Sequence, residues 1–118
     1  MLRRYFAALS AGDTAAVLAL FSPDGIVVSP FLGSLSATDF FARLAAATSD
    51  SRVSLLDATH GETTSAGRFN YEWTLADGTT GSFEGVDHFT FDGAGRVAAL
   101  RIYYDTHPLR AQVGDKYA

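Results

Sequence analysis

Cysteine is absent from the sequence, and lysine occurs only once, at Lys116. Without cysteine the chain has no disulfide, thiolate nucleophile or cysteine metal site, so we expect a cytoplasmic protein. Long apolar runs are also lacking, because none approaches the roughly 20 residues that a membrane-spanning helix needs. Residues 1–5 lead into a helical pattern without the apolar segment of a secretory signal. We therefore expect no membrane partner.

Basic side chains are few, and the net charge is −4. No basic stripe can follow a phosphate backbone, so we expect no nucleic-acid partner. The histidines, His60, His88 and His107, have no second histidine or acidic residue at metal-ligand spacing. Residues 93–98 formally match a nucleotide-binding glycine pattern, but a predicted strand follows where such a site needs a helix. We expect neither a metal nor a cofactor.

Aromatic residues are abundant instead, with nine Phe, five Tyr and one Trp in 118 residues. The hydrophobic fraction of 47% is typical of a globular protein. A chain of this length can bury about two-thirds of its unfolded surface. The rings either fill a core or line a cavity for a small hydrophobic molecule, and composition does not decide between the two.

The first third of the chain predicts three helices. The first spans residues 2–10, the second begins after the cap Asp13 and ends at Pro23, and the third begins at Ser36 in a capping box. A short strand, residues 26–29, precedes the third helix. The inner faces of the second and third helices are expected to carry Val17, Leu20, Phe21, Phe40, Phe41 and Leu44.

The rest of the chain predicts four strands separated by glycine-rich turns: residues 52–62, 68–75, 82–91 and 96–105. Helices followed by a meander of strands indicate an α+β fold, with three helices packed on a strongly curved, mainly antiparallel sheet. We expect one domain over residues 1–108 and a C-terminal tail over residues 109–118.

Asp87 breaks the pattern of its strand. It lies on the same strand face as four positions without a charged side chain, namely Phe83, Gly85, Phe89 and Phe91. A carboxyl group among rings loses hydration, which raises its pKa and lets the neutral acid donate a hydrogen bond to a ligand oxygen. The alternative is an ionised Asp87 that an arginine or a backbone amide satisfies.

The turn after this strand decides what faces Asp87. A four-residue turn over residues 92–95 places Asp87 opposite Leu100, whereas a three-residue turn with left-handed Gly95 places it opposite Arg101. A slip of one residue exchanges the inner and outer sets of side chains. The first register puts these residues on the face of Asp87: Ala98, Leu100, Ile102 and Tyr104.

Two stretches carry family motifs. The first contains Arg4-Tyr5-Phe6, Gly12-Asp13 and Ser29-Pro30-Phe31; the second contains Phe83, Val86-Asp87-His88-Phe89, Phe91-Asp92, Gly95-Arg96-Val97 and Tyr103-Tyr104. Both resemble the steroid Δ-isomerases, within the group that has the nuclear transport factor 2-like fold. The resemblance implies a cone-shaped sheet rolled over the helices, and it favours the four-residue turn.

The resemblance also implies functional residues. Tyr5 and Asp87 fall on the hydrogen-bond donors of that family's oxyanion hole. The family's general base is an aspartate where this chain has Ser29, and an unassisted hydroxyl cannot take a proton from carbon near neutral pH. Steroid isomerisation is therefore not expected. The predicted ligand pocket consists of Ser29, Phe31, Phe41, Trp73, Phe89, Leu100, Ile102 and Tyr104.

The end of the last strand, Tyr103-Tyr104-Asp105, resembles SnoaL-like polyketide cyclases, in which an acidic residue near this end acts as acid or base. Asp105 is thus a secondary acid/base candidate, with a solvated strand-end carboxylate as the alternative. Glu72 and Asp57 are further candidates for the base. The chain is either an isomerase-, cyclase- or dehydratase-like enzyme using Asp87 and Tyr5, or a non-catalytic binding or assembly domain. A protein-interaction module is a third possibility.

The outward face of the last hairpin is apolar enough to bind a second copy of the chain. We therefore expect a homodimer that forms through the sheet. The residues on this face are Val86, His88, Ala99, Arg101 and Tyr103.

Overall fold

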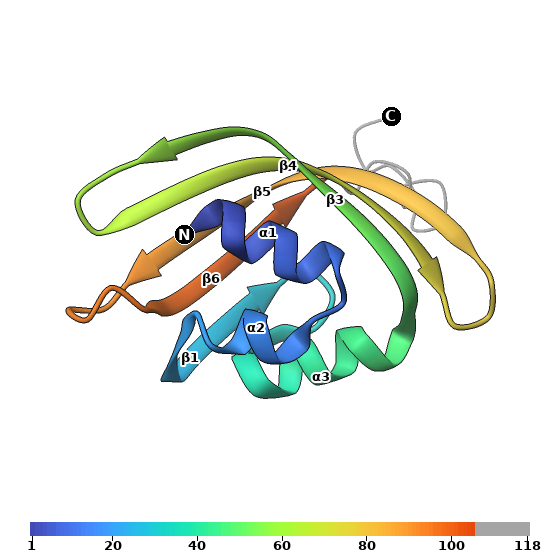
Figure 1. The fold of residues 1–118 in the computed structure, drawn as a ribbon, viewed down its shortest axis with the longest axis horizontal. Coiled ribbons are helices and arrows are strands. Elements are labelled where there is room, and N and C mark those ends of the chain that lie inside the picture. The colour runs from blue at the N-terminus through green and yellow to red at the C-terminus, as the bar shows by residue number, and fades with distance from the viewer. Residues whose placement is uncertain (106–118) are drawn as a thin grey trace, which may run out of the picture.

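The computed structural model describes residues 1–105 and shows helices lying in the concave face of a curved sheet (Figure 1). The sheet has six strands in the order β2-β1-β6-β5-β4-β3, and β1 pairs with β6 in parallel while the other neighbours are antiparallel. The predicted α+β fold is confirmed. The elements are α1 (Leu2–Ser10), α2 (Thr14–Leu18), β1 (Phe21–Ser29), β2 (Gly33–Ser36), α3 (Ala37–Ala47), β3 (Thr48–His60), β4 (Thr64–Leu75), β5 (Thr80–Phe91) and β6 (Val97–Tyr104).

None of the helices in this part of the chain is long and apolar enough to cross a membrane. The predicted tail, residues 109–118, and the end of the predicted domain lie outside the described residues.

The second helix is shorter than predicted. Asp13 caps α2 as expected, its carboxylate accepting a hydrogen bond from the Ala16 N–H at 3.0 Å, but the helix ends at Leu18. Phe21 instead opens β1, where it pairs with Val97 of β6. Pro23 lies within β1 at a register shift between Phe21 and Ile26, where the ladder does not need its missing N–H.

The third helix begins where the capping box predicts. The Ser36 hydroxyl accepts a hydrogen bond from the Asp39 N–H at 3.1 Å, and Phe40 and Phe41 are buried against the core. The short strand β2 immediately before it was not predicted. It pairs with the end of β1 across a tight turn that Gly33 closes with a φ of 68°.

The hairpin between β5 and β6 corrects both predicted registers. Its turn has three residues, because Gly95 has a φ of 80° and the Asp92 N–H donates to the Arg96 carbonyl at 2.8 Å. The four-residue turn that the resemblance favours is therefore wrong. However, Asp87 does not lie opposite Arg101 either; it pairs with Ile102.

A β-bulge explains the difference. Thr90 pairs with Ala99 while Phe91 pairs with Val97, so Ala98 is an extra residue on β6. This one-residue shift adds to the one-residue change in the turn, and the total shift of two residues restores the side chains to the faces of the four-residue register. As a result, Asp87 shares the inner face with Leu100, Ile102 and Tyr104, as the four-residue register predicted.

Close packing at Gly85 generates the first prediction. A Cβ at this position would lie 2.6 Å from the Tyr103 carbonyl oxygen and 2.9 Å from Cζ of Phe69. Gly85→Ala should lower the free energy of unfolding by about 1–3 kcal/mol, because backbone atoms must move. Gly93→Ala is the matched control, since a Cβ there meets nothing within 4 Å. Urea unfolding of both variants measures the difference, and equal midpoints would contradict the packing at Gly85.

Candidate functional site

A cavity of about 380 Å³ lies between the helices and the inner face of the sheet. Its wall combines α1, α3, the five strands β1, β3, β4, β5 and β6, and the turn between β1 and β2. Most lining side chains are apolar or aromatic. The lining residues are Tyr5, Leu9, Ser29, Phe31, Leu32, Phe40, Leu44, Ala47, Thr48, Phe69, Tyr71, Trp73, Leu75, Ser82, Phe83, Asp87, Ile102, Tyr104 and Asp105.

The Asp87 carboxyl group is buried in this wall, with 2% of the residue exposed. Its Oδ1 atom has no hydrogen-bond partner, and no arginine or backbone amide among residues 1–105 satisfies it. Burial raises the pKa of Asp87 well above its ordinary value, because a charged carboxylate would lose its hydration. Burial therefore favours the neutral acid, whose proton could be donated to a hydrogen-bond acceptor.

Tyr5 lies on α1 and lines the same cavity. Its ring is 1% exposed and packs edge-on against Phe89, with centroids 5.1 Å apart, and against Phe6 at 5.0 Å. Burial raises the pKa of the Tyr5 hydroxyl first, and the nearby Asp87 and Tyr71 raise it further. Tyr5 thus keeps its proton. Two groups that are distant in sequence and can donate hydrogen bonds line one cavity.

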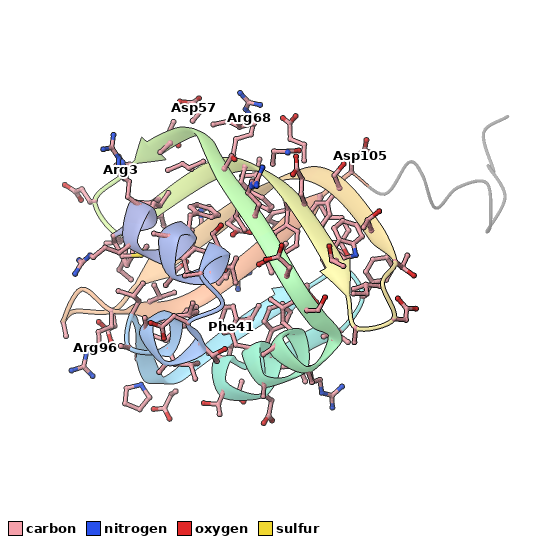
Figure 2. The ribbon with its side chains drawn as sticks, turned by 45° about the vertical axis from the view of Figure 1, so that its right-hand side comes forward. Arg3, Phe41, Asp57, Arg68, Arg96 and Asp105 are labelled. Carbon is pink, nitrogen blue, oxygen red and sulfur yellow. The ribbon has the colours of Figure 1, made fainter. Side chains whose placement is uncertain are left out.

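Five residues of the predicted ligand pocket line the cavity: Ser29, Phe31, Trp73, Ile102 and Tyr104. The other three, Phe41, Phe89 and Leu100, do not line it and lie in the core, with 2%, 0% and 0% of each residue exposed. Phe89 and Leu100 are cross-strand partners, and the Tyr5 ring covers Phe89. Phe41 lies between α3 and the sheet and packs against Phe21 and Phe40 (Figure 2).

The sequence prediction missed part of the lining. Phe69, Tyr71 and Leu75 share the inner face of β4 with Trp73, and Phe83 lies across from Tyr71 with the two rings stacked at 5.3 Å. The strict alternation of residues 69–75 was the signal that could have found them. The lining residues from α3 had a weaker signal, since an apolar helix face does not distinguish core from cavity.

Ser29 has a structural contact at the cavity. Its hydroxyl accepts a hydrogen bond from the Leu32 N–H at 3.1 Å and so holds the turn between β1 and β2. This turn presents Phe31 and Leu32, which are 66% and 41% exposed, beside the cavity.

Of the candidate bases, only Asp105 lines the cavity. Glu72 is exposed, between the inward-facing Tyr71 and Trp73, and so points to the opposite face of β4. Asp57 is exposed on β3, where its carboxylate accepts a hydrogen bond from the Ala58 N–H (Figure 2). Among residues 1–105, no three His, Asp or Glu side chains are grouped so that they could hold a metal ion.

Residues 2–100 match the SnoaL-like domain family. The chain belongs to this family. No curated protein sequence matches this SnoaL-like domain.

Solved structures share its fold at low sequence identity. A hypothetical protein with a ketosteroid isomerase-like fold from Catenulispora acidiphila, in complex with trimethylamine, is 18% identical over 96% of this chain and 91% of that chain, with a TM-score of 0.80. An NTF2-like protein of unknown function from Burkholderia pseudomallei is 18% identical over 97% and 95%, with a TM-score of 0.78. SalBIII, described as an epoxide hydrolase/cyclase-like enzyme in pyran ring formation in the polyether salinomycin, is 16% identical over 89% and 88%, with a TM-score of 0.77. The nuclear transport factor 2-like fold is confirmed.

The burial of Asp87 generates the second prediction. Its folded pKa lies above its unfolded one, so from about pH 4 upward the unfolded chain releases a proton that the SnoaL-like domain retains. The free energy of unfolding therefore falls as pH rises, by up to about 1.4 kcal/mol per pH unit, until the raised pKa is passed. Asp87→Asn cannot ionise and should lose this dependence. Urea unfolding from pH 4 to 8 measures the free energy of unfolding of each protein. The value for Asp87→Asn minus the value for wild type should increase with pH.

The control for this prediction is Val86→Asn, one residue away on the exposed face of β5. It introduces the same amide without removing a titratable group, so its offset from wild type should stay constant with pH. A constant offset for Asp87→Asn as well would show that Asp87 is not held neutral by the fold.

Proposed function

We propose that this SnoaL-like domain binds a small, mainly hydrophobic molecule in the cavity, where Asp87 and Tyr5 donate hydrogen bonds to an oxygen of the ligand. The unpartnered, buried Oδ1 of Asp87 carries this proposal. A buried polar group without a hydrogen bond costs free energy, and most such groups in proteins have partners. A ligand oxygen would complete this one.

The dimensions and lining of the cavity support a small-molecule ligand. Its volume of about 380 Å³ falls within the range of roughly 300–1,000 Å³ that is usual for ligand pockets. Apolar and aromatic side chains form most of the wall, which suits a hydrophobic ring system with few polar groups.

A cyclase-, isomerase- or dehydratase-type reaction is the second candidate function. It is favoured by Asp105, which lines the same cavity as Asp87 and would serve as the acid or base. The similar structure SalBIII is described as epoxide hydrolase/cyclase-like. Steroid isomerisation is not proposed, since Ser29 replaces the aspartate base and its hydroxyl holds the Leu32 N–H.

Binding of 2-naphthol tests the primary proposal, because this probe combines an apolar ring system with one hydroxyl oxygen. Asp87→Leu removes the donor and should raise the Kd about tenfold, whereas Asp87→Asn keeps an N–H donor and should stay within about threefold of wild type. Isothermal titration calorimetry gives the Kd, with Gly93→Ala, in the turn between β5 and β6, as the control that should bind like wild type. Equal affinity of wild type and Asp87→Leu, or no binding by the wild type at millimolar probe, would overturn the proposal.

We also propose that the chain forms a homodimer through the outer face of the sheet. Val86 and Tyr103 are cross-strand partners on this face, and they are 36% and 58% exposed. Burying such an apolar pair against a second copy would be favourable. Tyr103→Asp should convert a dimer into a monomer because it places a charge in the interface, and light scattering coupled to size exclusion measures the mass. A monomeric wild type would contradict this proposal.

A further inference from the structure

Four aromatic side chains meet at the exposed end of the cavity. Phe31 comes from the turn between β1 and β2, Trp73 from β4, Phe83 from β5 and Tyr104 from the end of β6. The ring of Phe83 lies 4.5 Å from Tyr104 and 5.4 Å from Trp73, and that of Phe31 lies 5.8 Å from Tyr104. Phe31 is 66% exposed, whereas Asp87 is 2% exposed. This aromatic cluster therefore forms the outer end of the cavity, and Asp87 marks its buried end.

Packing on a glycine positions the indole of Trp73. Trp73 pairs across the sheet with Gly81, and a Cβ on Gly81 would lie 2.5 Å from Cζ2 of the indole. The ring thus occupies the space that a side chain at position 81 would need. Because Gly81 leaves that space free, the indole lies over β5 beside Phe83 and contributes to the cavity wall.

The ionisable side chains that residues 1–105 contribute to the lining are all acidic. Among the described residues that line the cavity there is no arginine, lysine or histidine, and the acidic side chains are Asp87 and Asp105. Asp105 is exposed and follows Tyr104 directly, so it lies at the same end as the aromatic cluster. Arg52 borders Trp73 only in a separate recess, together with Asp50 and Glu72. An anionic ligand group would thus lose water without gaining a counter-charge.

We propose that the aromatic cluster is a subsite for an ammonium group. The faces of Trp, Tyr and Phe rings carry negative potential and attract cations within about 6 Å. The inference rests on the proposed function and extends it: the ligand carries an oxygen at the end that reaches Asp87 and a tertiary or quaternary ammonium group at the other end.

Two probes of nearly identical shape test this subsite. They are 6-tert-butyl-2-naphthol and its 6-trimethylammonio analogue, which differ by one positive charge and share the naphthol oxygen. Calorimetry on the full chain should show that the ammonium probe binds about tenfold more tightly, the factor that a cation–π contact of intermediate strength produces. The anionic analogue 6-hydroxy-2-naphthalenesulfonate should bind more weakly than either.

Variants in the cluster locate the effect. Phe31→Leu changes an exposed side chain and carries little risk to folding, and Trp73→Leu removes the indole. Both should reduce the preference for the ammonium probe to less than about threefold, since a leucine offers no ring face. Gly93→Ala, in the turn between β5 and β6 and outside the cavity lining, should retain the full preference.

The outcomes separate this inference from the proposed function. If the tert-butyl probe binds as tightly as the ammonium probe, or if both leucine variants keep the full preference, the subsite is disproved while ligand binding in the cavity stands. If neither probe binds but 2-naphthol does, the subsite again fails alone. If 2-naphthol also fails to bind, both ideas are wrong.

Discussion

Burial of the Asp87 carboxyl among aromatic rings is the constraint on which the proposed chemistry of this domain depends. The strand alternation of β5 turns the side chain inward, and the neighbouring inward positions supply only apolar atoms. No described group relieves the cost of removing Oδ1 from water. The fold therefore stores an unsatisfied interaction at the end of a cavity that is open to a ligand, which is where such a cost can be recovered on binding.

The inward position of Asp87 could be predicted because it follows from the period of a single strand. The register of the hairpin could not. The turn and the bulge at Ala98 each shift the pairing by one residue, and only their combination returns Leu100 and Ile102 to the inner face. A bulge depends on both strands together with the layers that pack on them, so neither composition nor the alternation of one strand reveals it. The end of α2 at Leu18 could not be predicted for a related reason. Phe21 has the spacing of a helical residue, but it pairs with Val97, 76 positions later (97 − 21), and so belongs to a strand.

The predicted pocket shows a second limit. Facing inward is a local property, and the sequence located it correctly for Phe89 and Leu100 as well as for Ile102. How deeply an inward-facing side chain is buried depends instead on the helices that pack over it. Tyr5 of α1 covers Phe89, whereas Phe83 and Tyr104, farther along the sheet, are only partly covered. The position of the helices therefore decides which aromatic residues fill the core and which line the cavity. Ser29 likewise accepts a hydrogen bond from the Leu32 N–H within its turn, a contact that no sequence pattern predicted.

The parallel pairing of β1 with β6 has a consequence for how the domain forms. The strand that begins at Phe21 stays next to an unfilled position in the sheet until the strand that begins at Val97 has been synthesised. Contacts of such long sequence separation are slow to form, because the intervening loop must close first. Nascent chains that stop before β6 would expose the unpaired edges of β5 and β1 to self-association. The cavity is consequently among the last parts of the molecule to be completed.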